Sequence, residues 1–261
     1  MKAALLVLLA LGATLFAHLL NAPPPQVEIA GYATSLKGRT ASQRHNAQLS
    51  AQALDGRVIA PGAVFSFNRT VRSWSVDRGY VKAPVSFDGE LVRAFGGGVC
   101  QTSTTLYNAA LLAGLVVRER HPHVFAPRYV PPGRDAAVAY PGVDLRVENP
   151  YTQPLRIRAS ARGDRLEIRL IGAKRPEGQI AVTEAVLSRT APVRLTRVVT
   201  RPEPAAGRVY LRSPGATGFR VVTYRVFYRA GREVRRERLG DDTYPAMNRI
   251  VQLNEDETPR L

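Results

Sequence analysis

Apolar and polar residues alternate with a period of two along several segments, a pattern typical of β-strands with one buried face. The segments that show this alternation are residues 26–36, 143–149, 154–160 and 165–172. Gly163 and Asp164 mark a tight turn between the last two of them, and two further short strands are predicted around Pro61 and Gly62. We predict that the last three alternating segments form a short meander that closes a first domain near Ala173.

Two other segments follow the helical period. Residues 40–56 predict a surface helix of about three turns with one thin apolar face, with Thr40 or Ser42 as its N-cap and Gly56 at its end. From about residue 102 to residue 115 the sequence is apolar on most sides, which predicts a helix that the rest of its domain buries.

The pattern changes again from Gln179 onward, where β segments are broken by glycine and proline. We therefore predict an α+β first domain over residues 26–173, with a central buried helix after Cys100 and antiparallel strands, and an all-β second domain over residues 178–256.

The N-terminal segment is apolar without a strand or amphipathic pattern. Residues 3–20 carry no formal charge and follow Lys2, and as a helix they would reach roughly 27 Å, close to the ~30 Å hydrocarbon layer. Residues 1–22 lack a clean small-x-small cleavage site, so we favour an uncleaved single-span anchor over a secretory signal or a buried core helix. With either of the first two, the remaining chain lies outside the cytoplasm, which argues against a nucleic-acid partner.

The charge is strongly basic, with 37 Lys and Arg against 21 Asp and Glu, a net charge of +16. Residues 174–238 hold 15 basic and 5 acidic residues, so the second domain carries much of the excess. Arginine pairs well with phosphate and carboxylate, which favours an anionic wall polymer or lipid surface as partner. GC-rich coding is the alternative explanation for the arginine excess.

The only cysteine, Cys100, follows the glycine run Gly96–Gly98 and precedes the buried helix. A helix N-terminus stabilises a thiolate, and the glycines leave room for a substrate to approach. A thiol enzyme also needs a base and a group that orients it. His121 and His123 point to the same side of an extended segment, and Asp135 follows. We predict Cys100, His121, His123 and Asp135 as catalytic residues.

Two other interpretations of Cys100 remain open. A lone cysteine before an apolar helix is often a small buried hydrophobe. Cys100, His121 and His123 are also a ligand set suited to zinc, although they come from two segments whose proximity is not shown. His45 could join either kind of site or cap its own helix. We predict no cofactor, with zinc as the alternative.

The long segment from Gly96 to Ala159, together with residues 43–68 and the motif at Gly79, resembles the VanW family domain over about residues 42–160. The resemblance implies an exported bacterial protein of the cell envelope, with no established reaction. Thr102 stands where the family more often has valine. The motif positions are Arg44, His45, Asn46, Gly96, Gly97, Gly98, Cys100, Gln101, Ser103, Thr104, His121, His123, Pro132, Gly133, Arg134 and Asp135. From among them we predict substrate binding by His45, Asn46, Gly97, Gly98, Gln101, Ser103, Thr104 and Arg134.

Residues 180–255 resemble a G5 domain, with glycines at Gly207, Gly215, Gly218 and Gly231 and with Asn254 at the fifth position. This resemblance implies an extended β module that binds aminosugar polymers, or else a rigid spacer. The combined hypothesis is an envelope protein that modifies peptidoglycan by thiol-dependent acyl transfer or amide hydrolysis. The competing hypothesis is a non-catalytic wall-binding protein with a structural Cys100.

Overall fold

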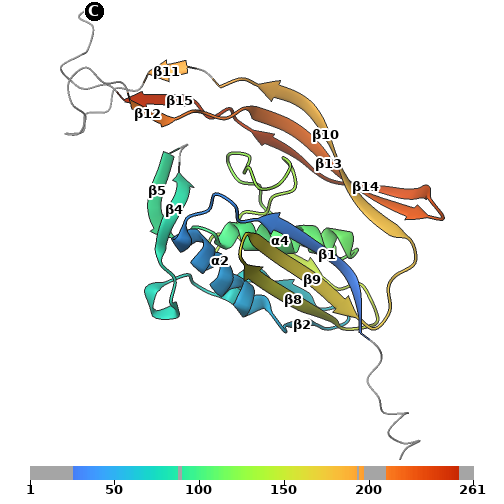
Figure 1. Ribbon diagram of the computed structural model, residues 1–261. Helices are drawn as coiled ribbons and strands as arrows, with labels where there is room; N and C mark the ends of the chain where they lie inside the picture. The colour runs from blue at the N-terminus through green and yellow to red at the C-terminus, as the bar shows by residue number, and fades with distance from the viewer. Residues whose placement is uncertain (1–25, 88–89, 193, 197–209, 253–261) are drawn as a thin grey trace, which may run out of the picture.

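The computed structural model describes residues 26–87, 90–192, 194–196 and 210–252 (Figure 1). Within these ranges no helix is long and apolar enough to cross a membrane. The anchor expected at residues 1–22 lies outside the described residues and stays a prediction.

A four-stranded antiparallel sheet forms the base of the first domain. Its order is β1 (Val27–Ser35), β9 (Arg165–Gly172), β8 (Leu155–Arg162) and β2 (Val58–Ile59). The alternation in the sequence has a direct counterpart in β9, where Leu166, Ile168 and Leu170 are fully buried and the residues between them are more exposed. Apolar side chains on one face of the sheet therefore form much of the core.

Two helices pack on this sheet and on each other, α2 (Ala41–Leu54) and α4 (Val99–Leu112). Helix α2 begins with a capping box in which Thr40 and Gln43 satisfy each other's backbone N–H groups, so Thr40 rather than Ser42 is the N-cap. Helix α4 is buried almost along its whole length. Its hydroxyl residues are buried too, and the hydrogen bonds that they make include that of Thr102 with Ser50 and that of Thr105 with Thr34.

Helix α4 begins three residues before the predicted position. Gly98 is its N-cap with φ of 103°, a left-handed conformation that glycine adopts readily, so Val99 and Cys100 already belong to the first turn. At the other end, Gly114 has φ of 78° and ends the helix near Leu112.

Shorter elements surround this core. They are the sheet β3 (Val64–Ser66), β7 (Arg146–Glu148) and β6 (Val116–Glu119), the hairpin β4 (Lys82–Phe87) and β5 (Glu90–Phe95), the short helix α3 (Phe67–Val71) and the 3-10 helix η1 (Val76–Arg78). The predicted meander is wrong in one respect, because β7 belongs to a different sheet from β8 and β9. The side chain of Asn149 explains the break, since it bonds to Ile59, Tyr151 and Gln153 and holds a bend between β7 and β8.

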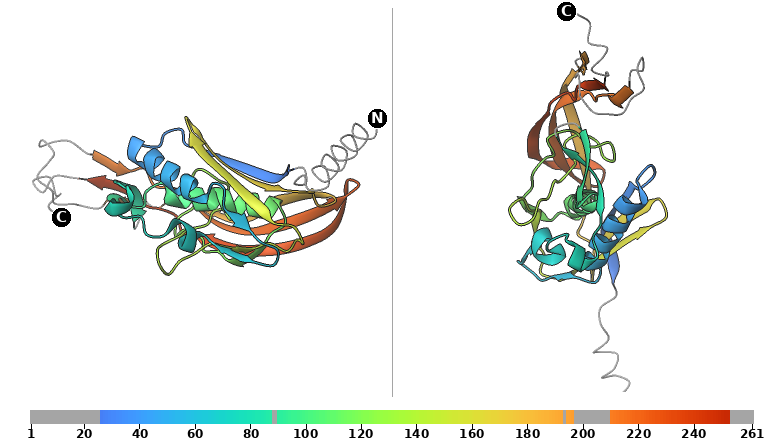
Figure 2. Two further views of the ribbon diagram at one scale, coloured as in Figure 1. Left: turned by 90° about the horizontal axis from the view of Figure 1, so that it is seen from below. Right: turned by 90° about the vertical axis from the view of Figure 1, so that its left-hand side faces the viewer.

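The second domain is built from long strands. β10 (Gln179–Thr190), β13 (Gly218–Arg229) and β14 (Arg232–Tyr244) form an antiparallel sheet. A smaller sheet joins β11 (Arg194–Thr196), β15 (Arg249–Gln252) and β12 (Tyr210–Ser213). The long sheet arches across the first domain, with the small sheet beyond one of its ends (Figures 1 and 2).

The long sheet contacts the first domain directly. Helix α4 touches β10, and Arg225 of β13 donates a 2.6 Å hydrogen bond to the carbonyl of Leu115. Arg134 and Glu184 form an ion pair of 3.3 Å across the same boundary. The two domains therefore share a packed face, which borders the site described next.

Candidate active site

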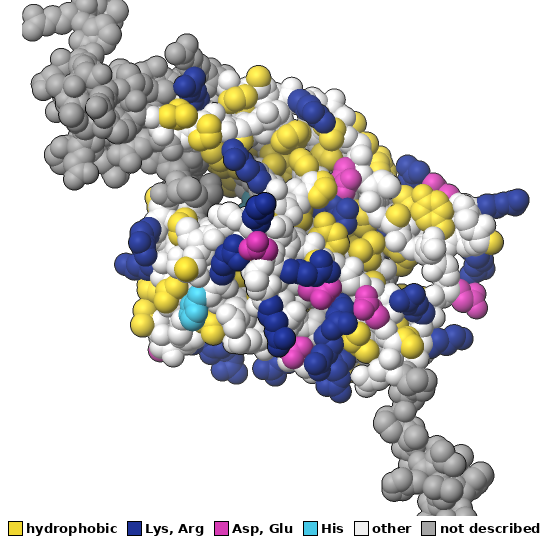
Figure 3. Space-filling model, viewed as in Figure 1, with side chains coloured by type: hydrophobic (Ala, Val, Ile, Leu, Met, Phe, Trp, Pro, Cys, Tyr) yellow, Lys and Arg dark blue, Asp and Glu magenta, His cyan; other side chains and the backbone are white. Residues whose placement is uncertain are grey.

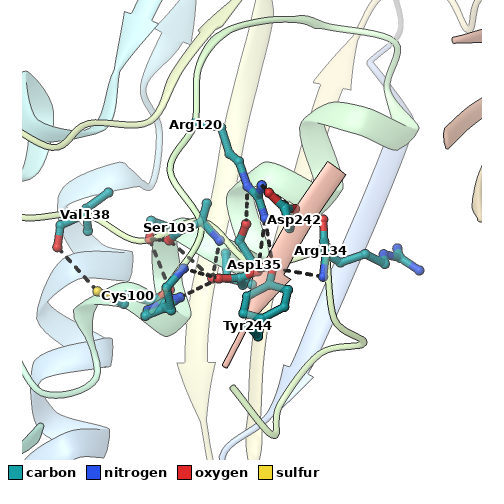
Figure 4. Close-up of polar contacts among 12 residues, drawn as sticks. Cys100, Ser103, Arg120, Arg134, Asp135, Val138, Asp242 and Tyr244 are labelled. Atoms are coloured by element: carbon teal, nitrogen blue, oxygen red, sulfur yellow. Dashed lines mark hydrogen bonds and ion pairs between the residues drawn. The ribbon is translucent and has the colours of Figure 1, made fainter. Parts of the chain in front are cut away.

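Cys100 is the second residue of α4, and its thiol is free and partly exposed. The thiol donates a 3.4 Å hydrogen bond to the carbonyl oxygen of Val138 (Figure 4). Burial raises the pKa of Cys100, but a hydrogen bond with His123 and the positive charge of that ring lower it, and the net pKa lies below its ordinary value. The positive end of the helix dipole acts in the same direction.

His123 is oriented by Asp135. Its Nδ1 lies 2.7 Å from Oδ2 of Asp135, and its backbone N–H donates to the same oxygen at 2.7 Å. This contact leaves Nε2 as the ring nitrogen for Cys100. Burial lowers the pKa of His123, but the hydrogen bonds with Asp135 and Cys100 outweigh it and raise the pKa to about 10. Both shifts act in the direction of a thiolate paired with an imidazolium.

Asp135 is fully buried, and both of its carboxylate oxygens are occupied. Oδ2 accepts the two bonds from His123, while Oδ1 accepts a 2.5 Å bond from the hydroxyl of Tyr244 and a 3.0 Å bond from Arg120 (Figure 4). Burial raises the pKa of Asp135, but these hydrogen bonds and the Arg120 charge hold it below its usual value. The carboxylate is therefore ionised and is held at both ends.

Helix α4 also holds the backbone next to Asp135. Ser103 donates a 2.7 Å hydrogen bond to the carbonyl of Ala136, and Thr104 accepts a 3.0 Å bond from the N–H of Ala136. Residues three and four positions apart share a helix face, so Ser103 and Thr104 lie on the same side as Cys100. One helix thus places both the thiol and the segment that carries the carboxylate.

The glycines before Cys100 serve packing. A Cβ at Gly96 would lie 2.5 Å from the indole of Trp74, and one at Gly97 would lie 2.6 Å from the carbonyl oxygen of Pro84. A Cβ at Gly98 would overlap the carbonyl of Gln43 in α2. Other parts of the protein fill the space where side chains at these positions would lie. The expectation that the missing side chains leave room for a substrate is therefore wrong. They let α4 start close to three other segments.

The remaining predicted substrate-binding residues are engaged in contacts within the protein. Asn46 bonds to Val81 and Gly97, and Gln101 bonds to Thr34, Ser35 and Arg39. His45 contacts the carbonyl of Gly79 at 2.8 Å, and Arg134 bonds to Asn108 and lies over the ring of Tyr32. These contacts engage polar atoms of all four residues, and the assignment of the four to substrate binding stays a prediction.

The two histidines have different surroundings. His121 contacts Glu119 at 3.0 Å and is 45% exposed, whereas His123 contacts Asp135 and is 25% exposed. The structure therefore joins His123, and not His121, to Asp135, and His123 also lowers the pKa of Cys100. The zinc set of Cys100, His121 and His123 is not assembled, and the described ranges contain no group of three or more His, Cys, Asp or Glu side chains arranged to hold a metal ion.

Sequence reasoning missed five residues of this region: Arg39, Arg120, Tyr129, Asp242 and Tyr244. The hydroxyl of Tyr129 lies 3.5 Å from Oγ1 of Thr104, and Arg39 lies over the ring of Tyr129 at 5.0 Å. Burial and the nearby Cys100 raise the pKa of Tyr129. Arg120 immediately precedes His121 and could have been found by inspecting that segment, but Asp242 and Tyr244 carry no local signal.

A cavity of about 900 Å³ lies elsewhere at the domain boundary. It is lined by aromatic and basic residues that include Tyr151, Arg175, Phe227, Tyr228, Arg229 and Arg235. It borders the C-terminal end of α4 at Leu112 and contains none of Cys100, His123 and Asp135. Along the helix this end is roughly 18 Å from Cys100 at ~1.5 Å per residue. The cavity is therefore separate from the thiol.

Comparison with known families agrees with both resemblances. Residues 42–171 match the family described as VanW like protein, and residues 188–254 match the G5 domain. The chain carries a VanW-like domain followed by a G5 domain. The expected order of the two is confirmed, while the domain limits predicted above stay predictions.

Two curated relatives share the VanW-like part. One is the uncharacterized protein YoaR of Bacillus subtilis, 43% identical over 143 residues that make up 55% of this chain and 47% of the relative. The other is the vancomycin B-type resistance protein VanW of Enterococcus faecalis, 35% identical over 109 residues that make up 40% of each chain. The chain thus spans less than half the length of either curated relative.

Two solved G5 domains match part of this chain. The G5 domain of an IgA1 protease is 22% identical, with a TM-score of 0.19, and the match covers 30% of this chain and 93% of that chain. The G5 domain HP0197-G5 is 19% identical, with a TM-score of 0.15, and the match covers 28% of this chain and 96% of that chain.

Proposed function

We propose that this chain is an extracytoplasmic cell-envelope protein that transfers or hydrolyses acyl groups of peptidoglycan peptides through the thiolate of Cys100. The observation that carries the proposal is Cys100 at the start of α4, with its pKa lowered by His123, whose Nδ1 lies 2.7 Å from the buried carboxylate of Asp135. It combines a nucleophile, a proton-transfer group and an orienting carboxylate. The VanW-like domain, with a relative named for vancomycin resistance, supports a wall substrate.

The chemistry follows from the protonation states. The Cys100 thiolate attacks the carbonyl carbon of a peptide bond, and a C–S bond forms. His123 gives its proton to the leaving amine as the C–N bond breaks, which leaves a thioester. An incoming amine or water then loses a proton to His123 and attacks the thioester, and the C–S bond breaks to restore the thiolate. An amine completes a transpeptidation, and water completes a hydrolysis.

The start of α4 also suits the oxyanion of the tetrahedral intermediates. The first N–H groups of a helix have no acceptor within the helix, and they point toward its N-terminal end. In α4 the N–H of Val99 already donates to the carbonyl of Gly96, so the groups that remain are those of Cys100 and Gln101. Such preorganised amides stabilise the charge that develops on the carbonyl oxygen.

Arg39 supplies a charge for substrate binding. Its Nε donates a 2.9 Å hydrogen bond to Gln101, which follows Cys100, and its guanidinium lies over the ring of Tyr129. Burial lowers the pKa of Arg39, and Tyr129 partly opposes this effect. Without a described acidic partner, its Nη groups are available to the carboxylate of a wall peptide.

The basic surface supports an anionic wall polymer as partner. On the face shown in Figure 3, basic side chains are spread over both domains with a few acidic ones among them. Binding of the polymer by the G5 domain brings the thiol site close to wall peptides, and an anchor at residues 1–22 keeps the protein at the outer face of the cell membrane. A G5 domain that acts only as a spacer is the alternative.

Alkylation of the thiol tests the proposal. The full chain at pH 7 is expected to react with iodoacetamide faster than a free thiol does, because the pKa of Cys100 is lowered. Incubation with a synthetic wall peptide should yield a thioester adduct, detected by mass spectrometry, that Cys100→Ser does not form. The histidine pair gives a matched control. His123→Gln should slow alkylation, and His121→Gln, two residues away, should not.

Two results would contradict the enzyme hypothesis. Alkylation only after unfolding would make Cys100 a structural residue, in keeping with its packing beside the core cluster. Alkylation that speeds up with a chelator, together with stoichiometric metal in the purified protein, would favour the zinc alternative.

A further inference from the structure

The carboxylate that orients His123 is completed by the second domain. Tyr244, the last residue of β14, is almost fully buried. Its hydroxyl donates a 2.5 Å hydrogen bond to Oδ1 of Asp135 and accepts a 3.0 Å bond from the N–H of Gly133. A single hydroxyl from the long sheet therefore holds both the carboxylate and the backbone two residues before it.

A second contact from β14 acts through Arg120. Asp242 forms a 2.6 Å ion pair with Nη1 of Arg120, and both side chains are about nine-tenths buried. Arg120 in turn donates from Nη2 to Oδ1 of Asp135 at 3.0 Å and from Nε to the Asp135 carbonyl at 2.7 Å. Asp242 and Tyr244 are two apart in one strand, so both side chains point to the same face of the sheet.

The first domain alone leaves Oδ1 with only Arg120. Its contacts to Asp135 are the two bonds from His123 on Oδ2 and the bonds from Arg120. Without Tyr244, the single bond from Arg120 would be all that restrains Oδ1 against rotation about the Cβ–Cγ bond, and that rotation would carry Oδ2 away from His123. The loop also lies directly on β13, because a Cβ at Gly133 would overlap the hydroxyl of Thr223.

We infer that Tyr244 and Asp242 are positioning residues of the thiol site, so that the long sheet of the G5-containing half is a working part of the catalytic unit in addition to any wall-binding role. Tyr244 fixes the Asp135 carboxylate, Asp242 fixes Arg120, and the two together keep His123 aligned with Cys100. The inference rests on the proposed function and names which part of the second domain the site depends on.

Tyr244→Phe in the full chain is the direct test, because it removes one hydroxyl and keeps the ring. Turnover of a synthetic wall peptide should fall roughly tenfold, as expected for losing a hydrogen bond to a charged group. The pH profile of Cys100 alkylation should shift to higher pH, because a misaligned His123 lowers the pKa of the thiol less. Thermal unfolding should remain cooperative, which separates this effect from loss of the fold.

Tyr224→Phe is the matched control, since Tyr224 lies in the neighbouring strand β13 and takes no described part in the bonds around Asp135. Asp242→Asn is the second variant, and it should shift the same alkylation profile in the same direction. An unchanged profile and unchanged turnover in Tyr244→Phe, or equal changes in Tyr244→Phe and Tyr224→Phe, would overturn the inference.

A readout that does not depend on thiol chemistry separates this inference from the proposed function. The His123 ring can be titrated by NMR in a Cys100→Ser background. Tyr244→Phe should move the pKa of His123 toward the ordinary value, because its short bond to Asp135 is loosened. If the wild-type thiol is no more reactive than a free thiol, the proposed function fails. If the wild-type thiol is reactive but the pKa of His123 is the same with and without Tyr244→Phe in the Cys100→Ser background, the positioning role fails.

Discussion

The two ends of β14 both carry charged residues but hold them in opposite ways. Near its start, Glu233 and Arg236 form a 2.8 Å ion pair with side chains 38% and 51% exposed. Near its end, Asp242 pairs with Arg120 at 2.6 Å with side chains 9% and 10% exposed. The distances are similar, and the surroundings differ.

The contrast shows that burial, more than distance, decides what an ion pair does. Water and salt screen the exposed pair, so it contributes little to stability. The buried pair has lost its hydration and depends on its protein partners, so removing one partner leaves an uncompensated charge. In this molecule the buried end is also the end that contacts Asp135, and the strand therefore couples sheet packing to the thiol site.

Among the substitutions that test the contrast between the two ends of β14, the largest effect is expected at Asp135, which the buried end contacts. Asp135→Asn replaces a charged acceptor with an amide, and peptide turnover should fall by about a hundredfold or more, because His123 loses the group that orients it. Steady-state kinetics measures the effect. Asp164→Asn is a control that removes a surface carboxylate 61% exposed, and it should leave turnover unchanged.

Acid titration sharpens the same comparison. Because the pKa of Asp135 is lowered in the fold, its contribution to stability is fully present above the unfolded value of about 3.9 and is lost as pH falls through the folded value. The difference in unfolding free energy between wild type and Asp135→Asn should therefore be constant between about pH 4 and the unfolded pKa of His123, about 6.5, and it should narrow below about pH 4. A difference in unfolding free energy between the two proteins that stays constant down to pH 2 would contradict the ionised state of Asp135.

Asp242→Asn probes the buried end for stability. It should lower the free energy of unfolding by about 3 kcal/mol, since Arg120 keeps its charge in a buried place with one carboxylate fewer. Urea unfolding followed by circular dichroism measures the change. If the loss of unfolding free energy is no greater than that for an exposed ion pair, Asp135 alone is enough to compensate the charge of Arg120.

Arg39 lies between these extremes, because it is half-buried and has no acidic partner among the described residues. Arg39→Gln should raise KM for a wall peptide roughly tenfold with a smaller change in kcat, as a lost charged contact to substrate predicts. The same substitution should leave an amidated peptide, which lacks the carboxylate, almost unaffected. Equal losses on both peptides would remove Arg39 from carboxylate binding.

The smallest effect is expected at the exposed end. Glu233→Gln removes the partner of Arg236, and neither the thermal midpoint nor the alkylation rate of Cys100 should change measurably. A clear loss of thiol reactivity there would mean that the outer part of β14 also reaches the site, and the contrast between the two ends would fail.

The sequence predicts the parts of this fold that depend on local pattern. The alternation in residues 165–172 and the apolar run after Cys100 correspond to β9 and α4. The strand pairing of residues 146–148 was out of reach, because the side chain of Asn149 and not the alternation sets the bend. The VanW-like motif named Cys100, His123 and Asp135 but could not choose between the two histidines.

The remaining part of the site depends on contacts far apart in the chain. Tyr244 meets Asp135 across 109 positions, and Asp242 meets Arg120 across 122. No periodicity or spacing encodes such a meeting, which is set by how the long sheet packs on the loop before Ala136. Similarly, the three glycines before Cys100 read as room for a ligand, and only the packed structure shows that Trp74, Pro84 and Gln43 fill it.

The position of Tyr244 in the chain also has a consequence for timing. A ribosome makes Cys100, His123 and Asp135 well before it makes the strand that ends at Tyr244. A nascent chain, or a product truncated before β14, therefore contains Cys100 without the contacts that Tyr244 and Asp242 make around Asp135. The full reactivity of the proposed nucleophile is therefore expected only once the last long strand has docked.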